Sequence, residues 1–144
     1  MARVTALHGR IVLSAWLPAG AVREVVRMMR ETVTAALDAP PTPPPFAWHD
    51  YGTLSGLLAA HGFRVDIESH AHVFTAASID EYLQGELIDH PLWVASRAML
   101  EALGKADVQA EIVDRAREIL TAGNEQPGGF AVTSSYVVAA AQRP

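Results

Sequence analysis

Residues 9–16 read Gly-Arg-Ile-Val-Leu-Ser-Ala-Trp, and this stretch decides which fold the chain can adopt. It is a nearly continuous apolar run, which is typical of a strand covered on both faces, as in an α/β sheet. Such a strand needs neighbouring strands, but only residues 1–8 precede it. We therefore expect the sequence to correspond to the second half of a larger fold.

The composition is that of one mildly acidic globular domain. Of the 144 residues, 50% are hydrophobic, and the formal net charge is -5 at pH 7. One sizeable core is expected, and nucleic acid is not an expected partner because Lys and Arg form no cluster. The absence of cysteine excludes disulfides and thiolate metal sites and favours a reducing cytoplasm as the location.

No membrane association is expected. No apolar stretch reaches the roughly 18–20 residues that a membrane span needs. The N-terminus has some likeness to a signal peptide, with Arg3 followed by an apolar run and a small-residue segment. Gly9-Arg10 interrupts that run, so we favour the strand interpretation.

Helical periodicity follows the first strand. Residues 21–37 place six apolar side chains on one stripe: Val22, Val25, Val26, Met29, Val33 and Leu37. The proline-rich run at residues 40–45 then predicts a stiff, extended connector. Asp50 can cap a short helix, which Gly62 can end in a left-handed conformation.

Residues 63–74 alternate as in a strand with one wet face, which favours a place near a sheet edge. One face carries Val65, Ile67, Ser69, Ala71 and Val73, and the other carries Arg64, Asp66, Glu68, His70 and His72. Residues 78–120 form a helical block, with capping-box spacing at Ser78 and Glu81 and a break at Pro91. The last helix is expected near residues 107–122, and residues 130–141 predict a final strand.

This ordered set resembles the C-terminal half of class I S-adenosylmethionine-dependent methyltransferases, in the ubiquinone/menaquinone-biosynthesis-type branch. Residues 9–16 look like the fifth strand of that family. Residues 46–50, with Leu54, Leu57, Leu58 and His61-Gly62-Phe63, look like its last helix and the entry into strand six. Residues 129–139 look like strand seven.

The resemblance implies an α/β fold in a single domain over residues 1–144. We expect a partial Rossmann-like mixed sheet with strands in the order five, seven, six and with strand seven antiparallel. Residues 78–122 would be a three-helix insertion that forms a cap.

The cofactor-binding segments of that family have no counterpart here. The family uses a Gly-rich turn after its first strand and an acidic residue that closes its second strand, and both would lie upstream. Gly128-Gly129 precedes a strand, so it cannot set a helix N-terminus against a cofactor. We assign no cofactor-binding residue and no catalytic residue, and we expect activity with S-adenosylmethionine only if another chain supplies the missing half.

The resemblance also suggests a substrate pocket for a small organic acceptor. The segments after strand five and before the last helix often line the substrate side in this family. They correspond to Ser14, Ala15, Trp16, Trp48 and His49, and two aromatic side chains flanking one histidine suit a flat acceptor. The alternative is that both tryptophans serve packing and that His49 is solvated.

A metal site is the weaker interpretation of the other histidines. His70 and His72 share a strand face, and Glu86 and His90 share a helical face. These pairs could form a site only if the helix crosses that strand, and solvated polar faces are the favoured interpretation. We therefore assign no metal.

Two functional classes remain: the substrate-binding half of a methyltransferase, and a non-catalytic, self-associating small-molecule-binding or scaffold protein. In the complete family fold, strand four flanks strand five. Without it, the edge of residues 11–16 would be bare and apolar, a state that natural proteins avoid. We therefore expect this edge to pair with a second copy, as a homodimer, or with a separate N-terminal-half chain.

Overall fold

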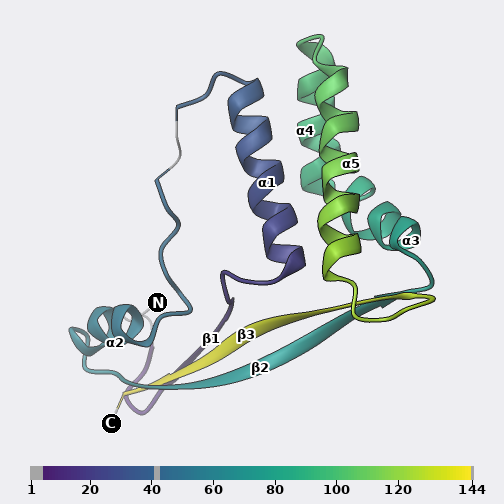
Figure 1. Cartoon of the computed structure of the whole chain (residues 1–144). Helices are drawn as coiled ribbons and strands as arrows, with labels where there is room; N and C mark the ends of the chain where they lie inside the picture. The colour runs from purple at the N-terminus through teal and green to yellow at the C-terminus, as the bar shows by residue number, and fades with distance from the viewer. Residues whose placement is uncertain (1–4, 41–42, 144) are drawn as a thin grey trace. The chain divides into compact units, whose positions relative to one another are not determined.

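A computed structural model describes residues 5–40 and 43–143 and shows a mixed α/β protein (Figure 1). Its elements in chain order are β1 (Arg10–Trp16), α1 (Ala21–Ala36), α2 (Tyr51–Ala59), β2 (Arg64–Ala76), α3 (Ile79–Leu83), the π-helical turn η2 (Gln84–Ile88), α4 (Pro91–Ala102), α5 (Ala106–Gly123) and β3 (Phe130–Gln142). The order of strands and helices is the expected one, with η2 as an addition. Part of the expected proline-rich connector, Pro41 and Thr42, lies outside the described residues.

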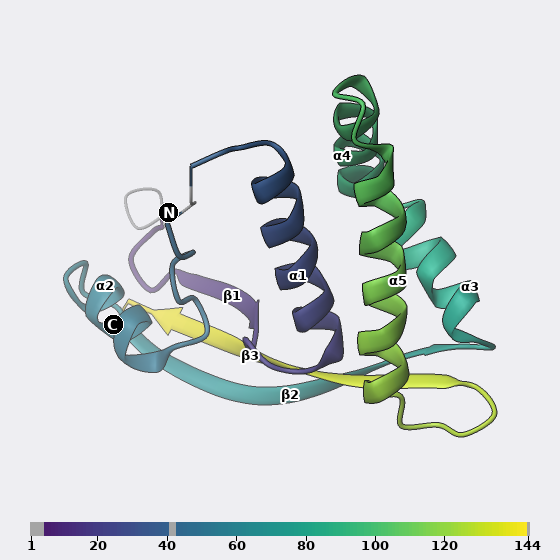
Figure 2. The same cartoon turned by 45° about the horizontal axis from the view of Figure 1, so that its top comes forward.

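The strands of the described chain form one sheet in the order β1-β3-β2 (Figure 2). β1 pairs antiparallel with β3 in a register that runs from Arg10↔Gln142 to Trp16↔Tyr136. The order is the one expected for strands five, seven and six. As expected for strand seven, β3 runs antiparallel to its neighbour β1, but the three-stranded sheet is antiparallel as a whole and not mixed.

The chain divides into two compact units. We call Met1–Pro18, Pro44–His72 and Ser135–Pro144 the sheet unit, and Ala19–Pro43 and Val73–Ser134 the helical unit. β2 and β3 each pass from one unit to the other. None of the helices formed by the described residues combines the length and the apolarity that crossing a membrane requires.

The core of the sheet unit joins α2 to one face of the strands. Its buried members are Ile11, Leu54, Leu58, Phe63, Val65, Ala139 and Ala141. As expected, Asp50 caps α2: its carboxylate accepts a hydrogen bond of 2.7 Å from the backbone N–H of Thr53. Gly62 follows the helix with φ 76°, a conformation in which glycine meets no Cβ penalty.

β1 is covered on one face only, so the expectation of a strand buried on both faces is wrong. Ile11 is buried in the core of the sheet unit, whereas Val12 is 61% exposed and Trp16 is 51% exposed. An apolar run is compatible with both arrangements, because alternate residues of a strand point to opposite faces whatever their type.

The expected alternation of β2 holds for only part of the strand. Val65 and Ile67 face the core of the sheet unit, as expected. Farther along, Phe74 and Ala76 pack against the core of the helical unit, and Val73 is 50% exposed. The inward-facing positions change from odd to even because the two halves of the strand belong to different cores.

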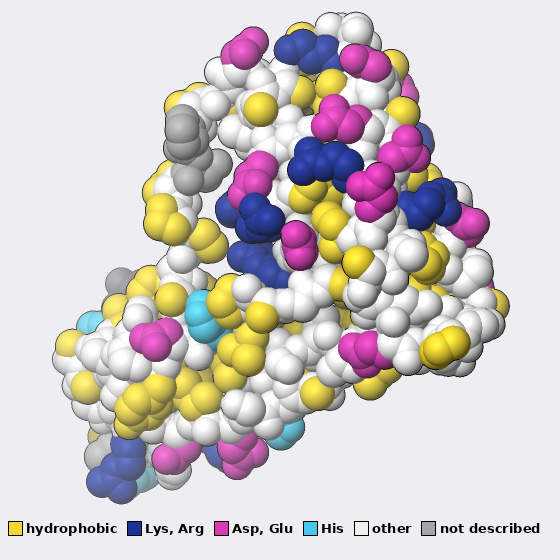
Figure 3. Space-filling view, in the orientation of Figure 1, with side chains coloured by type: hydrophobic (Ala, Val, Ile, Leu, Met, Phe, Trp, Pro, Cys, Tyr) yellow, Lys and Arg dark blue, Asp and Glu magenta, His cyan; other side chains and the backbone are white. Residues whose placement is uncertain are grey.

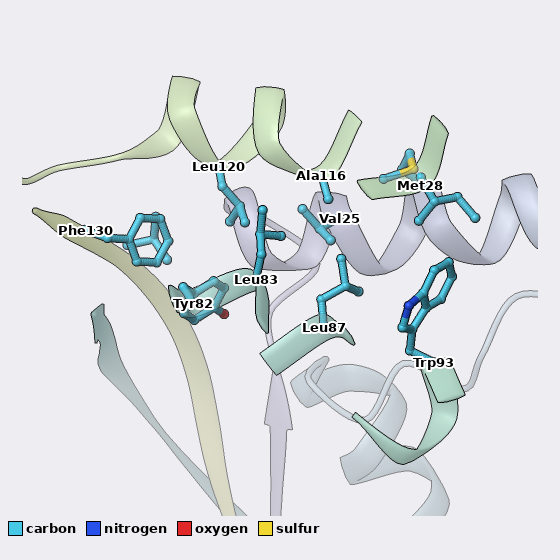
Figure 4. Close-up of a cluster of buried hydrophobic side chains, with 11 residues drawn as sticks. Val25, Met28, Tyr82, Leu83, Leu87, Trp93, Ala116, Leu120 and Phe130 are labelled. Atoms are coloured by element: carbon cyan, nitrogen blue, oxygen red, sulfur yellow. The ribbon is translucent and has the colours of Figure 1, made fainter. Parts of the chain in front are cut away.

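The helical unit packs α1 beside α5, with α3, η2 and α4 completing its core (Figures 1 and 2). The buried members are Val25, Met28, Tyr82, Leu83, Leu87, Trp93, Ile112, Ala116, Leu120, Phe130 and Val132 (Figure 4). Met28 is buried although it was not on the expected stripe, whereas Val26 is 42% exposed. A Cβ at Gly123 would lie 2.6 Å from the Cβ of Ala21, so glycine permits the close approach of α5 to the start of α1.

Ser78 caps α3 in the expected way. Its Oγ accepts a hydrogen bond of 3.1 Å from the backbone N–H of Glu81. The Glu81 carboxylate reaches back and accepts a hydrogen bond of 2.7 Å from the N–H of Ala77, one residue before the cap. The bond from Glu81 satisfies a backbone donor that a helix start leaves open, and the bond from Ala77 ties the residue before the cap to the first turn.

We expect Ser78→Ala to lower the free energy of unfolding by about 1 kcal/mol, because it removes the cap acceptor. Ser78→Asp keeps an acceptor at the same place and should retain most of the stability. Urea unfolding of the full chain measures both variants. Equal losses in the two variants would contradict a capping role for Ser78.

The cap of α2 should weaken in acid. Hydrogen bonds from the side chain and the backbone of Thr53 lower the pKa of Asp50 below its ordinary value of 3.8. Because the folded-state pKa is the lower one, the cap's contribution is complete above pH 3.8 and is lost as the pH falls below it. The protection of the Thr53 amide, measured as its hydrogen exchange relative to the intrinsic rate at each pH, should therefore fall in acid, and Asp50→Asn, which caps without titrating, should remove that dependence.

Candidate functional site

The helical unit contains a pocket of about 300 Å³, at the lower end of the size range for small-molecule sites. Most of its lining is apolar. The lining residues are Val22, Val25, Val26, Met29, Phe74, Tyr82, Leu83, Glu86, Leu87, His90, Trp93 and Leu120. Figure 4 shows several of these side chains converging from α1, α3, η2 and α5.

Two sequence stripes contribute most of the lining. On α1, Val22, Val25, Val26 and Met29 recur at helical spacing and supply an apolar wall. Tyr82 on α3, Glu86 on η2 and His90, which lies between η2 and α4, recur every four residues and supply the polar groups. The π-helical turn between them is marked by the hydrogen bond of 3.0 Å from the Asp89 N–H to the Gln84 carbonyl, five residues back.

Tyr82 brings a phenol hydroxyl to this pocket. Its ring packs on Phe130, with ring centroids 4.6 Å apart, and meets the edge of Phe74 at 6.1 Å. The residue is only 9% exposed, and its hydroxyl makes no hydrogen bond with any described residue. Figure 4 shows the hydroxyl at the end of the ring that points away from Phe130.

Burial, with a smaller contribution from the charge of Glu86, raises the pKa of Tyr82 to about 12. At neutral pH the residue is therefore a neutral phenol that can donate one hydrogen bond. A phenol with so high a pKa is a poor proton acceptor near neutral pH. Tyr82 thus suits hydrogen bonding to a ligand better than accepting a proton.

Glu86 adds a negative charge to the pocket lining. It is exposed, and it makes no ion pair or hydrogen bond with any residue in the described part of the chain. His90 also lines the pocket, and its carbonyl accepts the first backbone bonds of α4, from the N–H groups of Trp93 and Val94. No Lys or Arg is among the lining residues that the structure describes.

The substrate residues expected from the sequence lie in the sheet unit, outside this lining. Ser14 and Trp16 are exposed on β1, and His49 is half-buried beside the cap of α2. Trp48 packs on Phe46, with ring centroids 4.6 Å apart, rather than on Trp16. Their role in substrate binding stays a prediction.

Trp16 instead takes part in an aromatic row across the three strands. Its indole meets the edge of Tyr136 at 5.3 Å, and His70 stacks on the same tyrosine at 5.3 Å. His72 lies 6.3 Å from Trp16, and a carboxylate oxygen of Glu68 lies 3.7 Å from His70 Nε2. Sequence reasoning found the shared face of the two histidines but missed Tyr136, because only the strand register reveals that neighbour.

Metal ligands do not gather in this structure. Within residues 5–40 and 43–143, no three side chains of His, Asp or Glu come together in a way that could hold a metal ion. The two residue pairs considered for a metal have other surroundings: His70 and His72 adjoin aromatic rings, and Glu86 and His90 line the apolar pocket.

No protein-family model matches the chain, and no curated protein matches it either. Its class is therefore described by structure: a mixed α/β protein with a three-stranded antiparallel sheet and a helical unit that holds an apolar pocket.

Substitutions at Tyr82 test the environment of its hydroxyl. Tyr82→Phe removes a hydroxyl that has no hydrogen-bond partner among the described residues, so the free energy of unfolding should fall by no more than about 0.5 kcal/mol or rise slightly. Tyr82→Ala removes the ring and should cost about 3 kcal/mol or more. Denaturant unfolding measures both, and a loss above about 1 kcal/mol for Tyr82→Phe would show that the hydroxyl has a partner.

Proposed function

We propose that this protein binds a small, largely apolar molecule in the pocket of its helical unit. The observation that carries the proposal is an apolar pocket of about 300 Å³ with the Tyr82 hydroxyl free of hydrogen bonds to the described residues. Protein cores are packed to crystal-like density, and empty space in them lowers stability. A ligand that fills this space and pairs with the hydroxyl would recover that loss.

The proposed activity is binding without catalysis. The lining offers one neutral phenol, one carboxylate and one imidazole, and the high pKa of Tyr82 disfavours it as a base. The cysteine-free composition supports a cytoplasmic location for this binding protein.

A neutral naphthalene derivative tests the proposal. We expect 2-naphthalenemethanol to bind the full chain with one saturable site in calorimetry. Val26→Trp should abolish binding, because Val26 lines the pocket and is partly exposed, so that a larger side chain can enter the mouth without disrupting the core.

Leu103→Trp is the matched control, since Leu103 is an exposed leucine of the same unit that does not line the pocket. It should bind the probe as the unmodified chain does. Equal binding by the two tryptophan variants, or no binding by the unmodified chain, would refute the proposed pocket.

The substrate-binding half of a methyltransferase is a second candidate. It is favoured by the sheet order β1-β3-β2, which is the order that the resemblance implies for strands five, seven and six. In this interpretation, Ser14, Trp16, Trp48 and His49 contact the acceptor, and another chain supplies the Rossmann-like half with S-adenosylmethionine. The chain alone should then show no binding of S-adenosylmethionine in calorimetry, and saturable binding would contradict this version.

We also propose that the outer edge of β1 pairs with a second copy of the chain. β1 is an edge strand of the sheet that the described residues form, and its sequence from Ile11 to Trp16 carries no charge and no proline. Val12→Lys places a charge at an exposed position of that edge strand and should convert a dimer into a monomer in light scattering coupled to gel filtration.

Val94→Lys changes an exposed valine of the helical unit and should leave the dimer intact. A monomeric unmodified chain would refute the pairing. An effect of equal size from both lysine variants would point to a general effect of charge.

A further inference from the structure

The polar groups of the pocket lie on one wall. Tyr82, Glu86 and His90 come from the α3–η2 side, whereas α1 contributes only Val22, Val25, Val26 and Met29. A ligand in this pocket would therefore meet apolar side chains along its body and polar groups at one side. This asymmetry indicates the chemical class of ligand that fits. The inference about the ligand rests on the proposed binding function.

Five acidic residues on the surrounding helices have an arginine partner, whereas Glu86 lines the pocket without one in the described part of the chain. Glu24 and Glu31 pair with Arg27, Glu101 pairs with Arg97, Glu111 pairs with Arg115, and Asp80 pairs with Arg117. Figure 3 shows the result, with basic and acidic side chains interspersed over these helices. Glu86 has no such cation among the described residues, and the described lining contains no Lys or Arg.

Neither Tyr82 nor the wall of α1 neutralises this carboxylate. Tyr82 is an uncharged donor at neutral pH, and the apolar wall of α1 carries no charge into the pocket. A carboxylate at the edge of an apolar pocket attracts a cation and repels an anion, and the low dielectric of the apolar wall strengthens both effects.

We propose that the pocket selects an amphipathic amine: a flat apolar body about the size of naphthalene, with a protonated amino group that pairs with Glu86. The body would occupy the space between the valines of α1 and the rings of Tyr82 and Trp93. An acid of the same shape would bring a second negative charge to Glu86 and would be disfavoured.

Three probes of one shape separate the contributions: 2-naphthylmethylamine, 2-naphthalenemethanol and 2-naphthoate. Calorimetry with the full chain at pH 7 and low salt should rank them amine, alcohol, acid. Because Glu86 is partly solvated, the amine should bind about 3- to 5-fold more tightly than the alcohol, the range of an exposed ion pair. This advantage should shrink in high salt, which screens exposed charges.

Glu86→Gln is the decisive variant. It should reduce the affinity for the amine to the affinity for the alcohol, and it should leave the affinity for the alcohol unchanged. Glu118→Gln removes an exposed carboxylate from α5 that does not line the pocket, and it should change neither affinity.

The outcomes separate this inference from the proposed function. If none of the probes binds, the proposed pocket itself is refuted. If the alcohol binds as tightly as the amine and Glu86→Gln has no effect, or if the acid binds most tightly, selection of an amine is refuted while the pocket stands. If Glu118→Gln weakens the amine as much as Glu86→Gln does, the attraction comes from overall acidity and the role of Glu86 is refuted.

Discussion

The position of β3 between β1 and β2 is the constraint on which the rest of this structure depends. β3 is the last strand in the sequence, yet it pairs with the first strand in a register that joins Arg10 to Gln142. Its early residues Phe130 and Val132 belong to the core of the helical unit, and its later residues Ala139 and Ala141 belong to the core of the sheet unit. Both cores therefore depend on this strand, and weakening its pairing would affect both of them.

The pocket follows from how the helical unit builds its core. Long helices α1 and α5 pack together, while α3 and η2 present a tyrosine and a glutamate from a short, irregular helical segment. The irregular part of this segment is the π-helical turn η2, and π-helical turns are frequent at functional sites. An apolar wall and a polar wall meet at one pocket, which explains why small-molecule binding is the function that the geometry supports best.

Local signals predicted the elements well and the pocket poorly. Asp50, Ser78 and Glu81 form the expected caps, because capping depends on residues three or four apart. Glu86 and His90 were noted as a pair on one helical face, but their apolar surroundings come from α1, more than fifty residues away in the chain. Likewise, Tyr136 became a neighbour of Trp16 only through the register of β3.

Backbone periodicity, proline, glycine and capping side chains act over a few residues, so the order of strands and helices and most of their ends can be read from the sequence alone. The faces that are buried are set by long-range packing. Val12 is exposed although it stands in an apolar run, and β2 turns odd residues inward at Val65 but even residues inward at Phe74. The physical reason is that burial depends on which other elements cover a face, and those elements come from distant parts of the chain.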